Sequence, residues 1–267
     1  MLYREAKPSV QFSDVVERFW SVEYDGDGDA PVEPVLPDGC PEMVFNLADR
    51  FQRIPIYGDV ETQSTAIVSG QIRSRVLIRP TGRVSLFGVR FRPHGANGFF
   101  GVAMSSLTDQ IVPLETVVGG LSVELESRIA EVSTFEERVA SIELALSARR
   151  ANGDLSIAAG LTEMIGESGG QMSVRELVDC SGMGERRIER IFDKYVGLSP
   201  KVFSRIVRFR GVVRSIEAAD SFGLLDTALS FGYYDQSHMI HEFGEFAGTS
   251  PLAYFEETHR LSELFTS

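Results

Sequence analysis

The sequence has little of what a metal site, a disulfide framework or a membrane span requires. Its 267 residues include only two cysteines, Cys40 and Cys180, and four histidines, and the cysteine spacing matches no zinc motif. No apolar run approaches the roughly 20 residues of a membrane helix. The first residues, MLYREAKPSVQF, lack the apolar stretch of a secretory signal. We therefore expect a reduced, cytoplasmic chain with no cofactor, no metal, no catalytic site and no membrane partner.

Positive charge is also scarce, and only one segment carries an excess of it. The net charge is −12, which argues against a general nucleic-acid binder. Residues 1–170 carry 15 Lys or Arg against 24 Asp or Glu, and residues 215–260 carry one against eight. Residues 182–214 carry nine basic residues against three acidic ones. This one basic segment between two acidic ones predicts a localised site for an anion.

The N-terminal third has the pattern of short strands. The expected strands are rich in Val, Ile and Phe and are separated by Gly, Pro, Asp and Asn; they cover residues 15–24, 42–48, 53–58, 64–70, 73–80 and 83–93. Their spacing favours an antiparallel barrel or sandwich over βαβ units.

Helical patterns follow from about residue 95. Residues 134–150 form the strongest, with Thr134 and Glu137 as a capping box, and a second helix is expected over 155–166. The segment GESGGQ, residues 166–171, is the best linker in the chain. We therefore predict an α+β protein of two domains. Residues 1–170 form a mainly antiparallel β domain with added helices, β-rich to about residue 93, and residues 171–267 form an all-α domain.

The all-α domain contains an internal repeat. ELVDCSGMGERRIERIFDKYVGLSPKVF (176–203) matches DTALSFGYYDQSHMIHEFGEFAGTSPLAYF (226–255) in its turn glycines, its apolar helix positions and its Gly-x-Ser-Pro end. Each copy has the pattern of a helix-turn-helix, over residues 173–197 and 224–248. In the first copy, Ser173 and Glu176 predict a capping box for a helix over 174–181.

The first copy has a basic outward face. Its second helix, expected over 185–196, turns Ile188, Ile191, Phe192 and Tyr195 inward. This leaves a polar set outside: Arg186, Arg187, Glu189, Arg190 and Lys194. Arginine in such a helix can bond guanine in the major groove. A helix over 200–218 joins the copies, and its exposed basic side chains are candidates for phosphate contacts: Lys201, Arg205, Arg208 and Arg210.

With these motifs, residues 171–260 resemble the AraC/XylS-type DNA-binding domain. The match is carried by the GLSP and GTSP helix ends, by Ala-x3-Gly-Tyr-x-Asp-Gln-Ser-His at 228–238, and by Phe243. VLPDGCPEMVFNL (35–47) and FGVRFRPHGANGFFG (87–101) look like the N-terminal region of a bacterial subgroup of these regulators. The resemblance implies a transcription regulator whose N-terminal domain senses a signal, dimerises, or both.

The resemblance also implies which side chains read bases. By position these are Arg186, Glu189 and Arg190 in the first copy, and Gln236, Ser237, Ile240 and His241 in the second; Arg187 and Lys194 join the helix 200–218 as phosphate contacts. The family commonly has Arg at position 241, so His241 is a departure, as are the acidic Glu242 and Glu245. We expect the second copy to bind DNA less strongly than the first.

Several residues allow a functional or a structural interpretation. Five residues of the N-terminal domain could line an effector pocket or could simply belong to its interior: Trp20, Cys40, Phe87, Phe91 and His94. His238 and His241, with Glu242, have a spacing that could ligate a metal, but a structural role is the simpler interpretation.

The sequence thus predicts a sequence-specific DNA-binding transcription regulator. Because it contains no catalytic motif, we expect it not to be an enzyme. Its expected partners are double-stranded promoter or operator DNA, an unknown small-molecule effector, RNA polymerase and a second copy of the chain. Two alternatives stay open at this point. One is an enzyme with a barrel-like N-terminal domain, although residues 1–170 contain a single histidine, His94. The other is a regulator that acts mainly through protein contacts, which the acidic residues 215–260 would favour.

Overall fold

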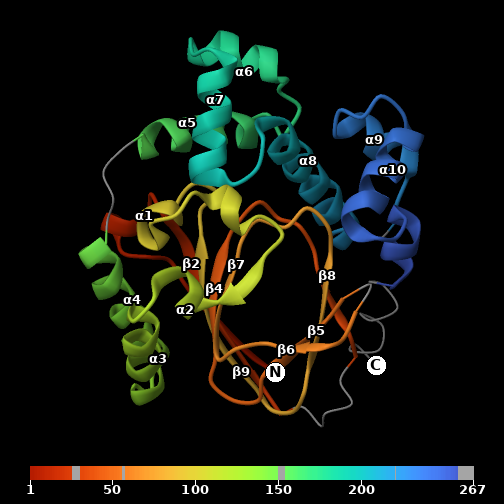
Figure 1. The fold of residues 1–267 in the computed structure, drawn as a ribbon. Coiled ribbons are helices and arrows are strands. Elements are labelled where there is room, and N and C mark those ends of the chain that lie inside the picture. Colours follow the sequence, from red (N-terminus) through yellow and green to blue (C-terminus); the bar gives the residue numbers. More distant parts are fainter. Residues whose placement is uncertain (26–30, 56–57, 150–153, 220, 258–267) are drawn as a thin grey trace.

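Two antiparallel sheets make up the N-terminal part of the chain (Figure 1). The computed structural model describes residues 1–25, 31–55, 58–149, 154–219 and 221–257. The larger sheet has six strands in the order β1 (Leu2–Ala6), β2 (Val16–Tyr24), β9 (Val84–Phe91), β4 (Glu42–Asn46), β7 (Ala66–Ser69) and β10 (Ile111–Pro113). The smaller has four, in the order β3 (Glu33–Val35), β8 (Val76–Pro80), β5 (Phe51–Ile54) and β6 (Glu61–Thr62).

The six-stranded sheet buries one face under aromatic side chains. Phe19 and Phe87 are fully buried, and their rings stack with centroids 6.4 Å apart. Phe87 also meets the edge of Phe135, at the start of α4 (Phe135–Arg149), at 5.9 Å. Because neighbouring strand residues point to opposite faces, Trp20 lies on the other face, where it covers Gly88 of the paired strand.

The expected strands are present, but the sheets form no barrel. All six predicted strands overlap an observed one, although residues 56 and 57 of the segment 53–58 lie outside the described residues. The larger sheet ends at β1 and β10, so within the described part of the chain it does not close on itself. The sequence pattern missed β1, β3, β6 and β10. β3, β6 and β10 have two or three residues each, and β1 is an edge strand with exposed side chains, so none shows a buried alternating face.

Helices follow the last long strand. They are α1 (Asn97–Phe100), α2 (Leu114–Val118), α3 (Leu121–Glu131) and α4, with a short 3₁₀ turn at η2 (Met104–Leu107). Another 3₁₀ turn, η1 (Val10–Phe12), lies between β1 and β2. The predicted capping box of α4 is present, because Glu137 N donates to Thr134 Oγ1 at 3.2 Å and Thr134 N donates to Glu137 Oε2 at 3.0 Å. α3 and α4 lie side by side at the left of Figure 1.

The C-terminal region is helical and has its own core. Its elements are α5 (Leu155–Glu167), α6 (Val174–Ser181), α7 (Glu185–Ile191), the π-helical segment η3 (Phe192–Val196), α8 (Pro200–Glu217), α9 (Leu224–Ser230) and α10 (Gln236–Ala247). Ala158, Leu161 and Ile165 of α5 belong to this core and not to that of the sheets. A boundary after residue 170 would therefore separate α5 from the helices against which it packs. No helix in the described ranges is long and apolar enough to cross a membrane.

Two contacts between the regions lie at the C-terminal ends of η3, which continues α7, and of α10. Thr108 Oγ1, just after η2, donates to the carbonyl of Gly197, where η3 ends. Arg75 N, just before β8, donates to the carbonyl of Phe246 in α10 at 2.8 Å. Both helices therefore rest their C-terminal ends on the N-terminal domain and extend away from the sheets (Figure 1).

The packing of Trp20 on Gly88 gives a stability prediction. A Cβ at Gly88 would lie 2.1 Å from Trp20 Cε2, so Gly88→Ala should lower the free energy of unfolding. We expect a loss of about 1–3 kcal/mol from overpacking. The matched control is Gly160→Ala in the middle of α5, where a Cβ meets nothing within 4 Å. That change should stabilise the helix by about 0.5–1 kcal/mol. Urea unfolding followed by the fluorescence of Trp20, the single tryptophan, measures both; equal effects would contradict the packing.

Candidate nucleic-acid interface

The first helix-turn-helix forms as its local sequence predicts. Ser173 caps α6, with Glu176 N donating to Ser173 Oγ at 3.2 Å and Ser173 N donating to Glu176 Oε2 at 2.8 Å. Gly182 then takes a φ of 66°, which a residue without a Cβ adopts at little cost. This left-handed residue ends α6 and turns the chain into α7.

The exposed face of α7 carries the predicted basic side chains. Ile188, Ile191, Phe192 and Tyr195 are buried, as expected. The outward set is exposed: Arg186, Arg187, Glu189, Arg190 and Lys194. The helix therefore exposes arginine and glutamate, residue types that can recognise base edges in the major groove of DNA. Its apolar face holds it to the domain.

The second unit repeats this geometry with neutral side chains. Gly232 has a φ of 72°, and Asp235 caps α10 by accepting from His238 N at 2.7 Å. Met239 and Phe243 are buried. Of the predicted base-reading residues, Gln236, Ser237 and His241 are exposed and Ile240 is partly buried.

The linker helix α8 does not present all its basic side chains to solvent. Lys201 is exposed and Arg210 is partly buried. Arg205 and Arg208 instead form ion pairs with α10, with Arg205 Nε 2.8 Å and Arg208 Nη2 2.9 Å from Glu242 Oε2. The sequence-based expectation that both bind phosphate did not foresee these partners, because Glu242 lies 34 residues or more away in sequence.

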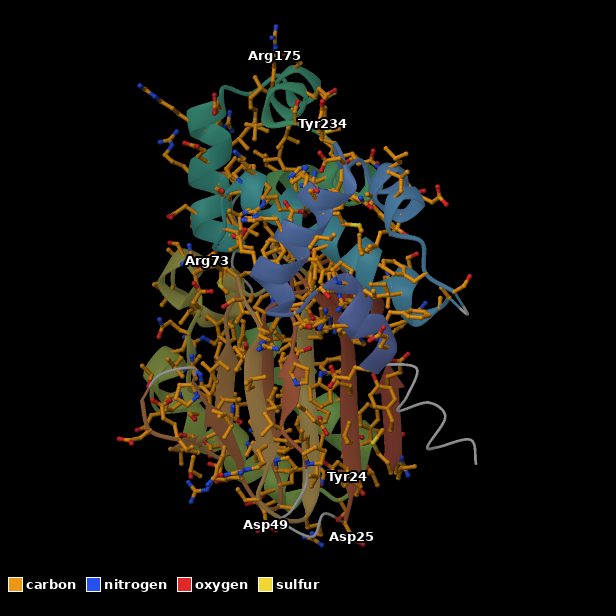
Figure 2. The ribbon with its side chains drawn as sticks, turned by 90° about the vertical axis from the view of Figure 1, so that its right-hand side faces the viewer. Tyr24, Asp25, Asp49, Arg73, Arg175 and Tyr234 are labelled. Carbon is orange, nitrogen blue, oxygen red and sulfur yellow. The ribbon has the colours of Figure 1, made fainter. Side chains whose placement is uncertain are left out.

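A groove separates the two units. It has a volume of about 600 Å³ and is lined by the residues before and at the start of α6, by Lys201, Arg205 and Arg208 of α8, and by His238 and His241 of α10. Figure 2 shows the helical region from the side, with Arg175 and Tyr234 at its outer end and Arg73 near the junction with the sheets. In the ranges that the structure describes, no group of three or more His, Cys, Asp or Glu side chains could hold a metal ion.

Comparison with known families agrees with this geometry. Residues 177–257 match the family model of a helix-turn-helix domain. The C-terminal region is a helix-turn-helix domain of the AraC type. Such a domain supports a DNA-binding transcription regulator. Residues 4–113 match a domain of unknown function (DUF6597), and no curated protein sequence matches the chain.

Solved structures give remote likenesses over most of the chain. ToxT from Vibrio cholerae is 10% identical over 89% of this chain and 97% of that chain, with a TM-score of 0.49. Unsaturated fatty acid-bound ToxT from the same organism is 10% identical over 89% and 94%, with a TM-score of 0.48. The AraC-like transcriptional activator CuxR is 13% identical over 80% and 86%, with a TM-score of 0.25.

The structure places the five candidate effector residues in different surroundings. Phe87 and Phe91 are completely buried in the core below the AraC-type domain, whereas Trp20 points to the opposite face of the sheet from Phe87. His94 lines a separate groove of about 320 Å³ beside α5. The sequence could not separate these positions, because the face of a sheet to which a side chain points depends on strand register.

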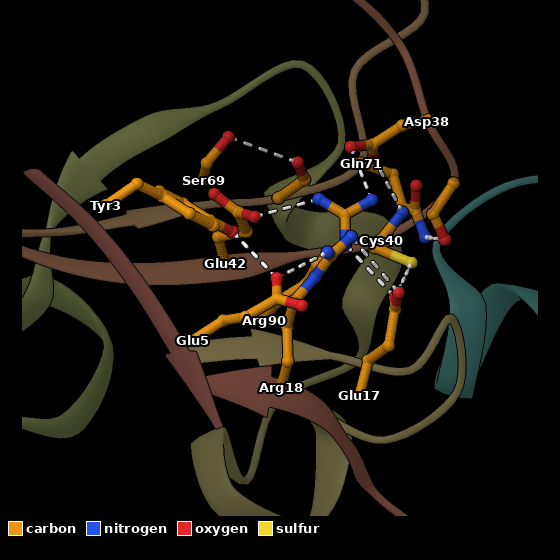
Figure 3. Close-up of polar contacts among 12 residues, drawn as sticks. Tyr3, Glu5, Glu17, Arg18, Asp38, Cys40, Glu42, Ser69, Gln71 and Arg90 are labelled. Carbon is orange, nitrogen blue, oxygen red and sulfur yellow. Dashed lines mark hydrogen bonds and ion pairs between the residues drawn. The ribbon is translucent and has the colours of Figure 1, made fainter. Parts of the chain in front are cut away.

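Cys40 belongs to a polar cluster that the sequence analysis missed (Figure 3). At its centre Arg90, with a side chain only 14% exposed, pairs with Glu17, Asp38 and Glu42 at 3.0, 2.6 and 2.8 Å. The Cys40 thiol donates to Glu17 at 3.4 Å, and burial raises the pKa of this thiol well above its usual range. The thiol therefore stays protonated, which does not suit a reactive cysteine.

This cluster borders the AraC-type domain. Gly39, between Asp38 and Cys40, has a φ of 82°, and its carbonyl accepts from Gln71 Nε2 at 2.8 Å. A Cβ at Gly39 would lie 3.0 Å from the ring of Phe203 in α8. The alternation of Arg90 with apolar Val89 and Phe91 was the available signal, since it puts a charge on the sheet face opposite the core.

His94 joins the N-terminal domain to α5. Its Nε2 lies 2.9 Å from the carbonyl oxygen of Asp14, and its Nδ1 lies 3.0 Å from Thr162 Oγ1. Because a carbonyl only accepts, Nε2 carries the hydrogen. Burial is the largest effect and lowers the pKa of His94. The hydrogen bond to the Asp14 backbone opposes it, and the charge of Arg92 lowers the pKa further against the charges of Asp14 and Glu163.

The lowered pKa gives a pH prediction. The unfolded chain binds the proton of this histidine more readily, near pH 6.5, so the stability that neutral His94 contributes is present above that pH and is lost as pH falls through it. His94→Gln should remove this pH dependence. We expect the parent-minus-variant difference in unfolding free energy to shrink between about pH 8 and about pH 5.5. Urea unfolding of both proteins at the two pH values measures it; a constant difference would contradict the effect.

Proposed function

We propose that the chain is a sequence-specific DNA-binding transcription regulator that reads two neighbouring major-groove segments with α7 and α10. The observation that carries this is the exposed row Arg186, Glu189 and Arg190 on α7, held outward by a fully buried apolar face. α10 repeats the arrangement, and the two helices extend from the N-terminal domain in the same sense (Figure 1). Double helix-turn-helix reading of one duplex face requires two helices presented together.

The two units divide the reading by chemistry. Arg186 and Arg190 suit the O6 and N7 acceptors of guanine, and Glu189 suits the amino group of cytosine. On α10, Gln236 suits adenine, Ser237 and His241 can form hydrogen bonds, and Ile240 can contact the thymine methyl group. Four other basic residues are then the candidates for phosphate contacts. They are exposed or partly buried, and within the described residues none forms an ion pair with a carboxylate: Arg187, Lys194, Lys201 and Arg210.

Control of DNA binding is proposed to lie in the N-terminal domain. This proposal is supported by two contacts between the domains. Thr108 contacts the end of the first helix-turn-helix unit, and Arg75 contacts the end of the second. A small-molecule effector or a partner that shifts this domain would change how the two units are presented. A second copy of the chain is part of the proposal, and sedimentation velocity of the purified protein would show a dimer mass if it holds.

DNA sequence selection with the purified full chain tests the function. We expect one enriched motif in double-stranded fragments. Arg186→Ala and Arg190→Ala should each weaken binding to that motif by about 5- to 150-fold, because a bidentate base contact contributes about 1–3 kcal/mol. They should also relax the sequence preference at one position each.

Arg128→Ala provides the matched control. Arg128 is a partly exposed arginine on α3, paired with Glu124 at 2.8 Å, and its loss should leave the affinity unchanged. If the chain enriches no DNA sequence, or if both α7 variants bind the motif as well as the parent, the proposed function is wrong.

A further inference from the structure

A carboxylate of the second reading helix is buried instead of facing DNA. The Glu242 side chain is 2% exposed although it lies in the middle of α10. It turns onto α8, where Arg208 donates to it from Nε at 3.2 Å and from Nη2 at 3.0 and 2.9 Å. Arg205 adds a bond from Nε at 2.8 Å.

Aromatic rings enclose the same ion pairs. The Arg208 guanidinium lies 4.5 Å from the ring centre of Tyr233, and that of Arg205 lies 5.0 Å from the ring centre of Phe246. Tyr233 lies before α10 and Phe246 lies near its end. The two arginines of α8 therefore contact residues at both ends of the second reading helix. Because these arginines are largely buried, water screens their ion pairs little.

The two arginines have few donors left for DNA. Arg205 uses Nε for Glu242 and both terminal nitrogens for Glu245, at 3.3 and 2.5 Å. The Arg205 and Arg208 side chains are only 24% and 14% exposed. A phosphate that took the donors facing Glu242 would leave a buried carboxylate without its partners, which is strongly unfavourable.

We propose that Glu242 is a positioning residue for sequence reading by the second unit, with Arg205 and Arg208 orienting α10 on α8 instead of binding phosphate. This inference rests on the proposed function. It explains how a helix with two carboxylates can face DNA, because α8 neutralises both of them. Gln236, Ser237 and His241 are then held at the exposed side of a fixed helix.

Half-site binding measurements with the full chain test the positioning. The probes are the duplex obtained by sequence selection and two versions in which the bases of either the first or the second half-site are replaced. Glu242→Gln should reduce discrimination against the altered second half-site by about tenfold, and discrimination at the first should stay within about twofold. Glu245→Gln, which removes the more exposed carboxylate, should change both by less than about threefold.

Removing the opposite charge as well should restore part of the reading. Glu242→Gln/Arg208→Gln leaves no unpaired charge from Arg208, so it should discriminate at the second half-site better than Glu242→Gln alone. A change that only destabilised the protein would affect both half-sites and would not be relieved by a second substitution.

Salt dependence separates orientation from phosphate binding. Arg205→Gln and Arg208→Gln should leave the slope of log K against log salt unchanged. Lys201→Gln, on the same helix and exposed, should lower its magnitude by about 0.9, the value for one phosphate contact. These slopes show whether Arg205 and Arg208 bind phosphate even if Glu242→Gln fails to fold.

Three results would overturn the inference. One is a slope that falls by about 0.9 in both arginine variants. The second is unchanged second-half-site discrimination in folded Glu242→Gln. The third is a selected motif that contains a single half-site, since no second reading helix would then need positioning. The first two results would leave the proposed function standing, and the third would contradict its reading by two helices but not DNA binding itself. Sequence-specific DNA binding fails separately, if no sequence is selected at all or if both α7 variants bind the motif as well as the parent.

Discussion

The C-terminal ends of η3, which continues α7, and of α10 rest on the N-terminal domain, and the proposed DNA interface depends on these contacts. Gly197 closes the first reading helix against Met104 and Thr108, and Phe246 near the end of the second accepts a hydrogen bond from Arg75. Arg73 and Asp109 join these two contact segments by an ion pair of 2.5 Å. A helix of about three turns has little stability alone. Holding both at one end sets their relation before DNA is met, so less ordering is needed on binding.

Charge is distributed so that an acidic protein can still offer a cationic surface. Glu242 and Glu245 pair with the arginines of α8, and three carboxylates of the N-terminal domain pair with Arg90. The basic side chains of α7 remain exposed. Because salt screens exposed charges beyond about 8–10 Å at physiological ionic strength, this local surface would matter more than the net charge in the proposed encounter with DNA.

The polar cluster at Arg90 and the aromatic core occupy opposite faces of one sheet. Arg90 shares its strand with Phe87 and Phe91, yet its partners are Glu17, Asp38 and Glu42 and theirs are other phenylalanines. The turn at Gly39 then brings the cluster against Phe203 of α8. This face of the sheet therefore contacts α8, the helix that joins the two helix-turn-helix units, directly.

The sequence by itself determined the local features of this protein. Ser173 with Glu176, Thr134 with Glu137, and the glycines at 182, 197, 232 and 248 fix where helices begin and end, because capping and positive φ depend on a few adjacent residues. The spacing of apolar residues in α7 likewise predicted that Arg186 and Arg190 are exposed. Only the tertiary structure decided that Arg205 and Arg208 face Glu242, that Trp20 and Phe87 lie on opposite faces, and that α5 packs with the C-terminal helices. Those outcomes depend on strand register and on contacts between residues far apart in sequence, which no local pattern encodes.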